Sequence, residues 1–256
     1  MMKDRSETAI EFVHVDYNVS DTRTLISDLN LAIRSHEVLI LLGRSGSGKT
    51  TTLKLMNRLH SPTRGEVLVE GRSTLQWDPI QLRRRMGYVV QEVGLFPHYT
   101  VEANVALIPK IEGWDRSRIE QRVAEILSLV GLPYEQYARR YPHALSGGQR
   151  QRVGLARALA ANPPILLMDE PFGALDPLTR AELQREFKLL QKRLGTTVVL
   201  VTHDVTEALL LGDRIALMES GTSAGVFTPV EFLNSSDEKV KAYVEIYRSS
   251  FQLLNG

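Results

Sequence analysis

The 256-residue sequence predicts an α/β fold with a mainly parallel sheet, antiparallel strands near the N-terminus and an inserted helical subdomain. Short, continuous apolar runs at residues 38–42 and 165–168 are typical of strands that are buried on both faces of a parallel sheet. A helical pattern over 181–194 separates the second run from a third, at 197–201, which is rich in β-branched residues. This alternation is that of a βαβ fold.

The N-terminal quarter predicts the first elements. Apolar side chains within 10–15 predict an opening strand, with Tyr17 following at its end. The run 38–42 stops abruptly at Gly43, and residues 50–59 then place apolar side chains at helical spacing. The predicted order is therefore a strand, a glycine-rich loop and a helix.

The middle of the chain is expected to be helical. Asp115 can cap a helix in which apolar residues recur with a 3.6-residue period. These residues are Ile119, Val123, Ile126, Leu127 and Val130. Because helix and loop patterns prevail from about 93 to 161, we expect a helical subdomain there, inserted into an α/β domain over 1–234. The polar tail, 235–256, is expected to be helical as well.

Composition limits the classes of function. Hydrophobic residues make up 43% of the chain and charged residues 24%, which is ordinary for a folded protein. The formal net charge of +1 offers no basic surplus, so we expect no nucleic-acid partner. The absence of cysteine excludes disulfides and thiolate metal sites. No apolar stretch follows residues 1–7 and no run approaches the roughly 20 residues of a membrane span, so we expect a cytoplasmic chain that reaches membranes through a partner.

A phosphate-binding loop is predicted between the strand 38–42 and the helix that follows. The matching residues are Gly43, Arg44, Ser45, Gly46, Ser47, Gly48, Lys49 and Thr50. Glycines let backbone N–H groups turn inward around phosphate oxygens, and the helix start adds its positive dipole end. Lys49 can then reach the β- and γ-phosphates, and the Thr50 hydroxyl can bind Mg²⁺. The alternative is a glycine loop that matches by chance; the flanking strand and helix favour a P-loop NTPase core.

An acidic pair follows the strand 165–168. Asp169 would hold Mg²⁺, as the strand-end aspartate does in phosphate-loop nucleotidases. Glu170 would then polarise an attacking water beyond the γ-phosphate. An Asp–Glu pair after a strand can also be a helix cap, and the loop at Lys49 favours the catalytic interpretation.

A second anion-binding helix start is predicted further along the chain. Its residues are Leu145, Ser146, Gly147, Gly148 and Gln149. Ser146 and the two glycines open a helix whose first N–H groups are exposed to an anion. A chain with two phosphate-binding helix starts suggests a nucleotide that is bound between two copies.

This string resembles the signature of ATP-binding-cassette (ABC) ATPases, and the order and spacing of the other motifs are similar to that family over about 10–219. The resemblance implies that Tyr17 stacks on adenine and that Thr51 contacts the α-phosphate. It implies that Gln91 contacts Mg²⁺ and the attacking water, and that Asp176 communicates across a dimer. His203 resembles the switch histidine at the γ-phosphate. A strand-end tyrosine and a structural histidine are the simpler interpretations of Tyr17 and His203.

The resemblance also implies a mechanism. Two chains would close on two ATP molecules, each held between Lys49 of one chain and Ser146 of the other, together with Gly147, Gly148 and Gln149. Catalysis would then be mostly positioning and electrostatics, and a monomer would hydrolyse ATP poorly.

A narrower resemblance concerns the cargo. The segment 91–105, followed by Ile108 and Pro109, is similar to bacterial importers of glycine betaine, choline and proline. It implies permease subunits that contact the helical subdomain, a solute-binding protein reached through the permease, a second ATPase chain, and a peripheral place on the cytoplasmic face of the inner membrane.

Two departures from that branch weaken the cargo hypothesis. Its relatives often carry a pair of regulatory domains after the ATPase, whereas this sequence stops at Gly256, so we expect no osmotic regulation within this chain. The sequence of the segment 219–225 also departs from the pattern that is usual in the family. An ATPase of another amino-acid-type importer, of an exporter or lipid transporter, or of a soluble system acting on DNA or ribosomes stays an alternative. Against the soluble class, the sequence carries one cassette and no coiled-coil heptads between its motifs.

Overall fold

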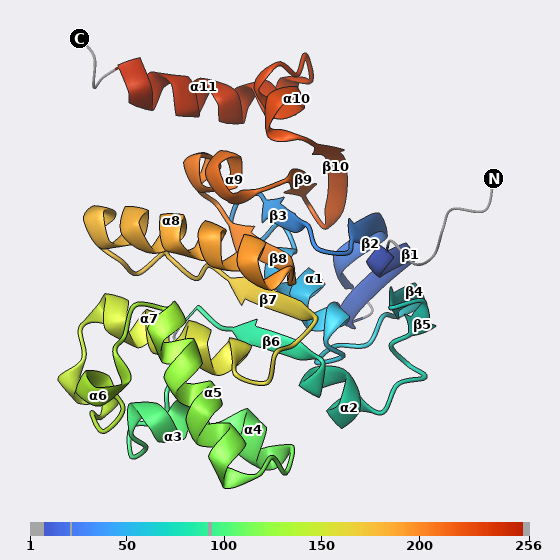
Figure 1. Ribbon diagram of the computed structural model, residues 1–256. Coiled ribbons are helices and arrows are strands. Elements are labelled where there is room, and N and C mark those ends of the chain that lie inside the picture. The colour runs from blue at the N-terminus through green and yellow to red at the C-terminus, as the bar shows by residue number, and fades with distance from the viewer. Residues whose placement is uncertain (1–7, 21, 92–93, 253–256) are drawn as a thin grey trace. The chain divides into compact units, whose positions relative to one another are not determined.

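A computed structural model describes residues 8–20, 22–91 and 94–252, the last three without their side chains (Figure 1). The chain forms two compact units, Met1–Leu82 with Thr197–Gly256, and Arg83–Thr196. The predicted start of the helical subdomain, residue 93, and its neighbour Glu92 lie outside the described residues. The division predicted at 93 and 161 therefore stays a prediction.

The first unit contains an antiparallel sheet in the order β2-β1-β4-β5. Its strands are β1 (Thr8–Ser20), β2 (Arg23–Arg34), β4 (Arg64–Val69) and β5 (Arg72–Ser73). The N-terminal antiparallel strands are thus confirmed. The expectation that Tyr17 follows the first strand was wrong, because β1 continues to Ser20 through register shifts at its pairing with β2.

The same unit contains strands in the order β10-β9-β3-β8. They are β3 (Val38–Leu42), β8 (Thr197–Thr202), β9 (Arg214–Glu219) and β10 (Thr222–Phe227). β3 is parallel to both of its neighbours, and all five of its residues are buried. Because every residue of β3 is buried, residues 38–42 are all apolar. The prediction of a strand here is confirmed.

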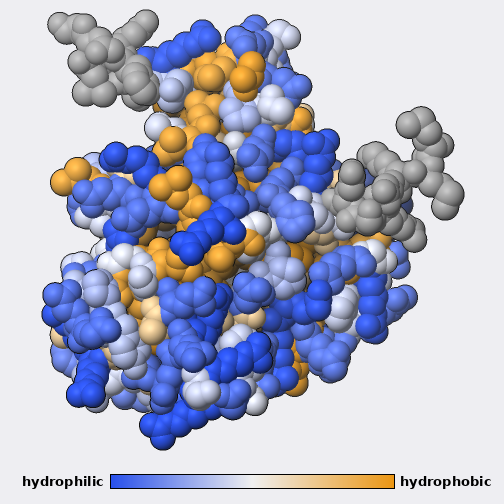
Figure 2. All heavy atoms as spheres, viewed as in Figure 1, coloured by the Kyte–Doolittle hydropathy of each residue, from blue (hydrophilic) through white to orange (hydrophobic). Residues whose placement is uncertain are grey.

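The helices of the first unit are α1 (Lys49–Met56), α9 (Val205–Leu211), α10 (Pro229–Leu233) and α11 (Glu238–Gln252). α1 ends three residues before the predicted end at Leu59, because Arg58 turns to a φ of 54°. Figure 2 shows apolar atoms over α10 and α11, where Val230 and Ile246 are more than half exposed. Within the described ranges, the search for a helix long and apolar enough to cross a bilayer found none.

The second unit pairs β6 (Met86–Val89) with β7 (Ile165–Asp169) in parallel. Its helices are α3 (Val101–Val105), α4 (Leu107–Ile111), α5 (Arg116–Leu129), α6 (Tyr134–Tyr137), α7 (Gly147–Leu159) and α8 (Pro177–Leu194), with a 3₁₀ turn at Pro142–Ala144. Helix α2 (Pro79–Arg84) runs across the boundary between the units in sequence. The Asp115 cap of α5 is confirmed, since its carboxylate accepts from the Arg118 N–H at 2.9 Å.

An ion pair with little solvent exposure joins β9 to β2 and to the turn between β2 and β3. The Arg214 guanidinium at the start of β9 donates to both carboxylate oxygens of Glu37, at 2.9 and 2.6 Å, and to the Ala32 carbonyl in β2 at 2.6 Å. Glu37 in turn accepts from the Arg34 N–H at 2.6 Å. The two side chains are only 17% and 9% exposed, so neither charge can be solvated if its partner is lost.

We expect Arg214→Ala to lower the free energy of unfolding by about 3 kcal/mol, because it leaves the buried Glu37 carboxylate without its cation. Urea unfolding followed by circular dichroism measures the change. Lys239→Ala is the control in the same unit: its ion pair with Glu219 has both side chains about half exposed, so the unfolding midpoint should hardly move. Equal shifts for the two variants would contradict the expectation.

Candidate functional site

The phosphate loop lies between β3 and α1, as predicted. Gly46 and Gly48 have φ values of 82° and 99°, in the left-handed region that favours glycine. α1 begins after Gly48, which has no side chain to cap the first N–H groups of the helix. The loop therefore presents backbone donors at a helix start.

Lys49 is buried at the centre of this loop, with 5% of its surface exposed. Its ammonium donates to the carbonyls of Gly43 and Arg44, at 2.7 and 2.8 Å. The loop thus holds the lysine charge in place through its own main chain. Thr50 and Thr51, the next two predicted ligands, are half-buried at the start of α1.

Close packing explains why two of the loop glycines carry no side chain. A Cβ on Gly43 would lie 2.4 Å from the Met218 carbonyl oxygen of β9. A Cβ on Gly48 would lie 2.7 Å from the Ile26 Cδ1 atom of β2. The remaining loop residues differ in exposure: Arg44, Ser45 and Gly46 are exposed, and Ser47 is buried.

His203 follows β8 directly, as predicted, and is exposed. Together with Gly43 and Arg44 it lines a pocket of about 300 Å³, whose other wall comes from α11. The first unit thus places His203, the predicted switch histidine, beside the start of the phosphate loop. Tyr17, in β1, is half-buried and stacks on His60.

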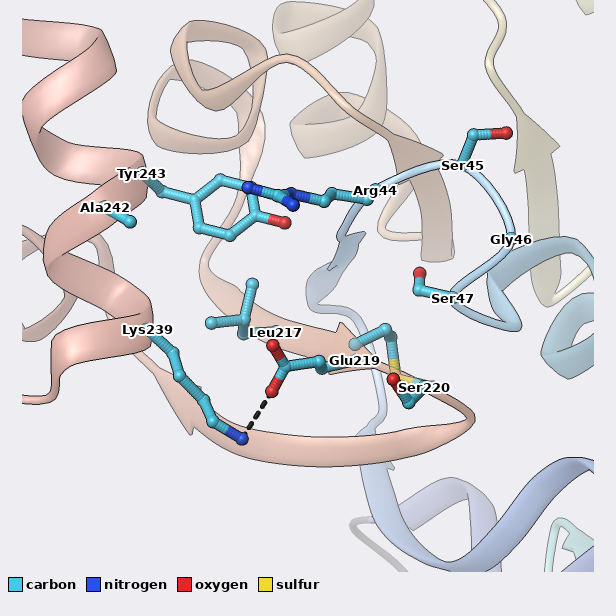
Figure 3. Close-up of a pocket in the computed structure, with 11 residues that line it drawn as sticks. Arg44, Ser45, Gly46, Ser47, Leu217, Glu219, Ser220, Lys239, Ala242 and Tyr243 are labelled. Atoms are coloured by element: carbon cyan, nitrogen blue, oxygen red, sulfur yellow. Dashed lines mark ion pairs between the residues drawn. The ribbon is translucent and has the colours of Figure 1, made fainter.

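Helix α11 borders the phosphate loop, which sequence reasoning missed. A second pocket of about 370 Å³ has the loop residues 44–47 on one side and Lys239, Ala242 and Tyr243 of α11 on the other. Figure 3 shows the Tyr243 ring beside the Arg44 side chain, above the ion pair of Lys239 with Glu219. The polar sequence of the tail does not reveal that α11 lies across a pocket from the loop, because this arrangement depends on tertiary packing.

The second unit carries the acidic pair. Asp169 is the last residue of β7 and is buried, whereas Glu170 is half-buried with a φ of 45°. Gln91 is exposed and donates to the Glu170 carboxylate at 3.5 Å, so two of the predicted catalytic residues lie together. Burial and the charge of Asp169 raise the pKa of the Tyr88 phenol to about 12, so this phenol is neutral at neutral pH.

Ser146 is the N-cap of α7, whose first residue is Gly147, so Ser146 and the two glycines open this helix as predicted. The Ser146 hydroxyl accepts from the Gln149 N–H at 3.2 Å, and the Gln149 side chain accepts from the Ser146 N–H at 2.9 Å. This capping box fixes the end of the helix. A Cβ on Gly147 would meet no atom within 4 Å, so the first turn has open space beside it.

Asp176 caps α8, which begins four residues before the predicted start at Ala181. Its carboxylate accepts from the Thr179 N–H at 3.1 Å. That bond, with a second from the Thr179 side chain, lowers the pKa of Asp176. A Cβ on Gly148 would lie 2.5 Å from the Thr179 Cγ2 atom, so one threonine touches both motifs. The string Asp-Pro is a cap signal that could have revealed this helix start.

The donor set suits Mg²⁺. The predicted ligands Thr50, Gln91 and Asp169 offer a hydroxyl, an amide and a carboxylate oxygen, the hard donors that this cation prefers when phosphate oxygens complete its shell. Across the described ranges, no three His, Cys, Asp or Glu side chains gather into a metal site of their own.

Several known proteins are similar to this chain. The choline transport ATP-binding protein OpuBA of Bacillus subtilis is 48% identical over 89% of the chain and 61% of its own length. The osmoprotectant import ATP-binding protein OsmV of Salmonella typhimurium is 46% identical over 90% and 60%. The glycine betaine uptake system ATP-binding protein YehX of Escherichia coli is 48% identical over 88% and 72%. The chain thus spans about three fifths of the length of the first curated relatives that it matches.

Solved structures are similar to this chain as well. The ATP-binding cassette MJ0796, a dimer bound to ADP and Pi, has a TM-score of 0.76 and 34% identity, over 86% of this chain and 98% of that one. cbiO1 from Clostridium perfringens, part of the ABC transporter complex cbiONQ, has a TM-score of 0.83 and 26% identity, over 96% and 99%. The expected P-loop NTPase fold is confirmed. The family model of the ABC transporter matches residues 26–173, more than half of the sequence, and the chain therefore belongs to the ABC transporter family.

Proposed function

We propose that this chain is the ATP-hydrolysing subunit of a bacterial importer for glycine betaine, choline, carnitine or a related osmoprotectant. The observation that carries the proposal is the group of relatives at 46–48% identity, whose names all refer to transport, import or uptake of these compounds. The resemblance of the segment 91–105 to the same branch agrees with it.

The proposed site binds ATP through both units. The loop 43–50 cradles the phosphates with backbone N–H groups, and the buried Lys49 ammonium meets the charge that develops on the γ-phosphate. Tyr17 stacks on the adenine and Thr51 contacts the α-phosphate. His203, which lines a pocket with Gly43, contacts the γ-phosphate.

The second unit would supply the chemistry. Glu170 accepts a proton from the attacking water, and Gln91, which donates to Glu170, orients that water. Thr50, Gln91 and Asp169 would hold Mg²⁺, which neutralises phosphate charge when it is bound. Ser146, Gly147, Gly148 and Gln149 of a second chain complete the site, and Asp176 communicates between the chains.

The proposed assembly lies at a membrane. Two copies of the chain would bind permease subunits through the helices of the second unit, on the cytoplasmic face of the plasma membrane. An extracytoplasmic solute-binding protein would deliver cargo to the permease. No nucleic acid takes part in this proposal.

Affinity purification from detergent-solubilised native membranes tests the cargo and the partners. We expect the tagged chain to co-purify with a polytopic permease and a solute-binding protein, both identified by mass spectrometry. That solute-binding protein should bind glycine betaine, choline or carnitine in calorimetric titrations. Recovery from the cytosol alone, or together with DNA or ribosomes, would refute the transport proposal and leave the ATPase chemistry standing.

We expect Glu170→Gln to retain ATP binding and to lose ATP hydrolysis by about 100-fold or more, because the amide cannot accept the proton of the attacking water. The variant should elute as an ATP-stabilised dimer from a sizing column. The matched control is Glu182→Gln, the same change on α8 in the same unit, which should hydrolyse ATP at the rate of the unaltered chain. Normal turnover by Glu170→Gln would exclude it as the base.

Mixing two inactive variants tests whether each site needs both chains. Lys49→Ala removes the charge in the phosphate loop, and Gly147→Glu puts a carboxylate into the open space at the start of α7, where the fold tolerates it. In a random mixture half of the dimers are mixed and each has one intact site, so activity should recover to about a quarter of the unaltered level.

The control for this experiment mixes Lys49→Ala with Thr50→Ala. Both changes lie in the phosphate loop, so every site in the mixed dimer keeps one defect and activity should not recover. Equal recovery in the two mixtures, or none in either, would contradict the shared site.

A further inference from the structure

The aromatic ring of Tyr17 is stacked on one face. The centroids of the Tyr17 and His60 rings are 4.8 Å apart and their planes differ by 20°, a parallel stack within the usual distance range. Tyr17 is half-buried. Because the imidazole stacks on one face of the phenol ring, a base that also stacks on this ring would use the opposite face.

His60 is attached rigidly to the helix that begins at the phosphate loop. The N–H groups of Leu59 and His60 both donate to the Lys54 carbonyl in the last turn of α1, at 2.9 and 3.0 Å. The Leu59 N–H also lies 3.1 Å from the Asn57 side-chain oxygen. α1 starts at Lys49, so a single short helix connects the phosphate-binding ammonium to the imidazole that supports Tyr17.

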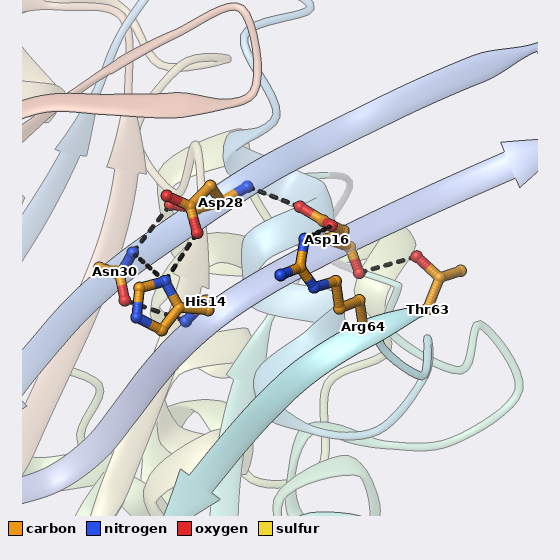
Figure 4. A network of polar contacts seen from close by, with 6 residues as sticks. All are labelled: His14, Asp16, Asp28, Asn30, Thr63 and Arg64. Atoms are coloured by element: carbon orange, nitrogen blue, oxygen red, sulfur yellow. Dashed lines mark hydrogen bonds and ion pairs between the residues drawn. The ribbon is translucent and has the colours of Figure 1, made fainter.

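The strand that carries Tyr17 is joined to the same segment. The Asp16 carbonyl accepts from the Thr63 N–H at 2.8 Å and from the Thr63 hydroxyl at 3.0 Å (Figure 4). A Cβ on Gly65 would lie 2.1 Å from the His14 carbonyl oxygen, so the two backbones touch without an intervening side chain. Both partners of the stack are therefore held by main-chain contacts within a few residues of their rings.

The imidazole acts here as an uncharged ring. Burial, and after it the charge of Lys54, lowers the pKa of His60, so the neutral form prevails near neutral pH. The stack therefore depends on the flat shape and area of the ring, which a phenylalanine can supply as well.

We propose that His60 is a positioning residue for nucleotide binding: it supports the face of Tyr17 opposite to the adenine and sets the distance from the base to the phosphate loop through α1. The inference rests on the proposed function, because it requires that Tyr17 stacks on adenine. A ring that is already ordered loses little freedom when a base stacks on it, and this preorganisation strengthens binding.

The test compares a ligand that has a base with one that has none. Removing the support by His60→Ala should weaken ATP binding roughly threefold to tenfold, the effect of leaving one side chain to be ordered on binding. Inorganic tripolyphosphate, which contacts only the loop, should bind His60→Ala as it binds the unaltered chain. His60→Phe should restore ATP affinity. Isothermal titration calorimetry in the presence of Mg²⁺ measures each constant.

Two further variants isolate the pair. In a Tyr17→Ala background, His60→Ala should cause no additional loss of ATP affinity, because the ring that it supports is gone. His14→Ala is the matched control: this histidine lies in the same unit, is exposed and pairs with Asp28, and its loss should leave both ligands unaffected (Figure 4).

Three outcomes would overturn the inference. His60→Ala could bind ATP as well as the unaltered chain does. It could weaken ATP and tripolyphosphate equally, which would mean that the change damages the loop. His60→Phe could fail to restore binding. An unaltered chain that binds neither ligand would overturn the proposed function itself, whereas the first three outcomes leave that function intact.

Discussion

The phosphate loop depends on direct contact between main chains, with no space for a side chain between them. Gly43 lies against the Met218 carbonyl of β9, where an added Cβ would be 2.4 Å from the oxygen. Gly221 has an equally close approach to the Leu25 carbonyl of β2, and its N–H donates to the Ser47 carbonyl at 3.1 Å. The loop, the turn after β9 and the edge of β2 thus form one backbone assembly. Since the loop carbonyls in turn hold the Lys49 ammonium, the position of that charge follows from the packing of two sheets in the first unit.

The segment 219–225, whose sequence departs from the usual family pattern, forms the end of β9, a turn and the start of β10. Ser220 and Gly221 have φ values of 48° and 81°, and the two strands on either side of them pair in antiparallel register. The contacts of this turn with the loop and with β2 use backbone N–H and C=O groups, which every residue except proline carries. Side chains can therefore differ from the family pattern here while the backbone geometry stays. The position of Gly221 is strict, because both its φ and its close contact with the Leu25 carbonyl exclude a Cβ.

Sequence patterns predicted two kinds of element: those that a short contiguous motif determines, and strands in which every residue is buried. β3, β7 and β8 are buried throughout, so their apolar runs are unambiguous. β2 was not predicted, because its burial alternates irregularly and Asp28 interrupts it with a φ of 44°. The same division holds in the site. The loop 43–50 could be predicted because its residues are contiguous in the sequence. The stack of Tyr17 on His60 and the position of α11 across a pocket from the loop depend on tertiary folding, so the sequence did not reveal them.

Contiguous motifs and tertiary contacts have different consequences for the recognition of a nucleotide. In the proposed site, backbone N–H groups and one lysine hold the phosphates, and close packing of the loop glycines leaves little room for substitution there. An aromatic side chain would hold the base, and its neighbours can vary as long as they keep the ring in place. Chains that share the loop can therefore differ in how firmly they order the base. In this chain the short helix α1 connects the proposed phosphate site with the proposed base site, since Lys49 begins the helix and the turn after it positions His60. The affinity for a nucleotide, as distinct from that for phosphate alone, should therefore depend on residues at the end of α1 that touch no phosphate.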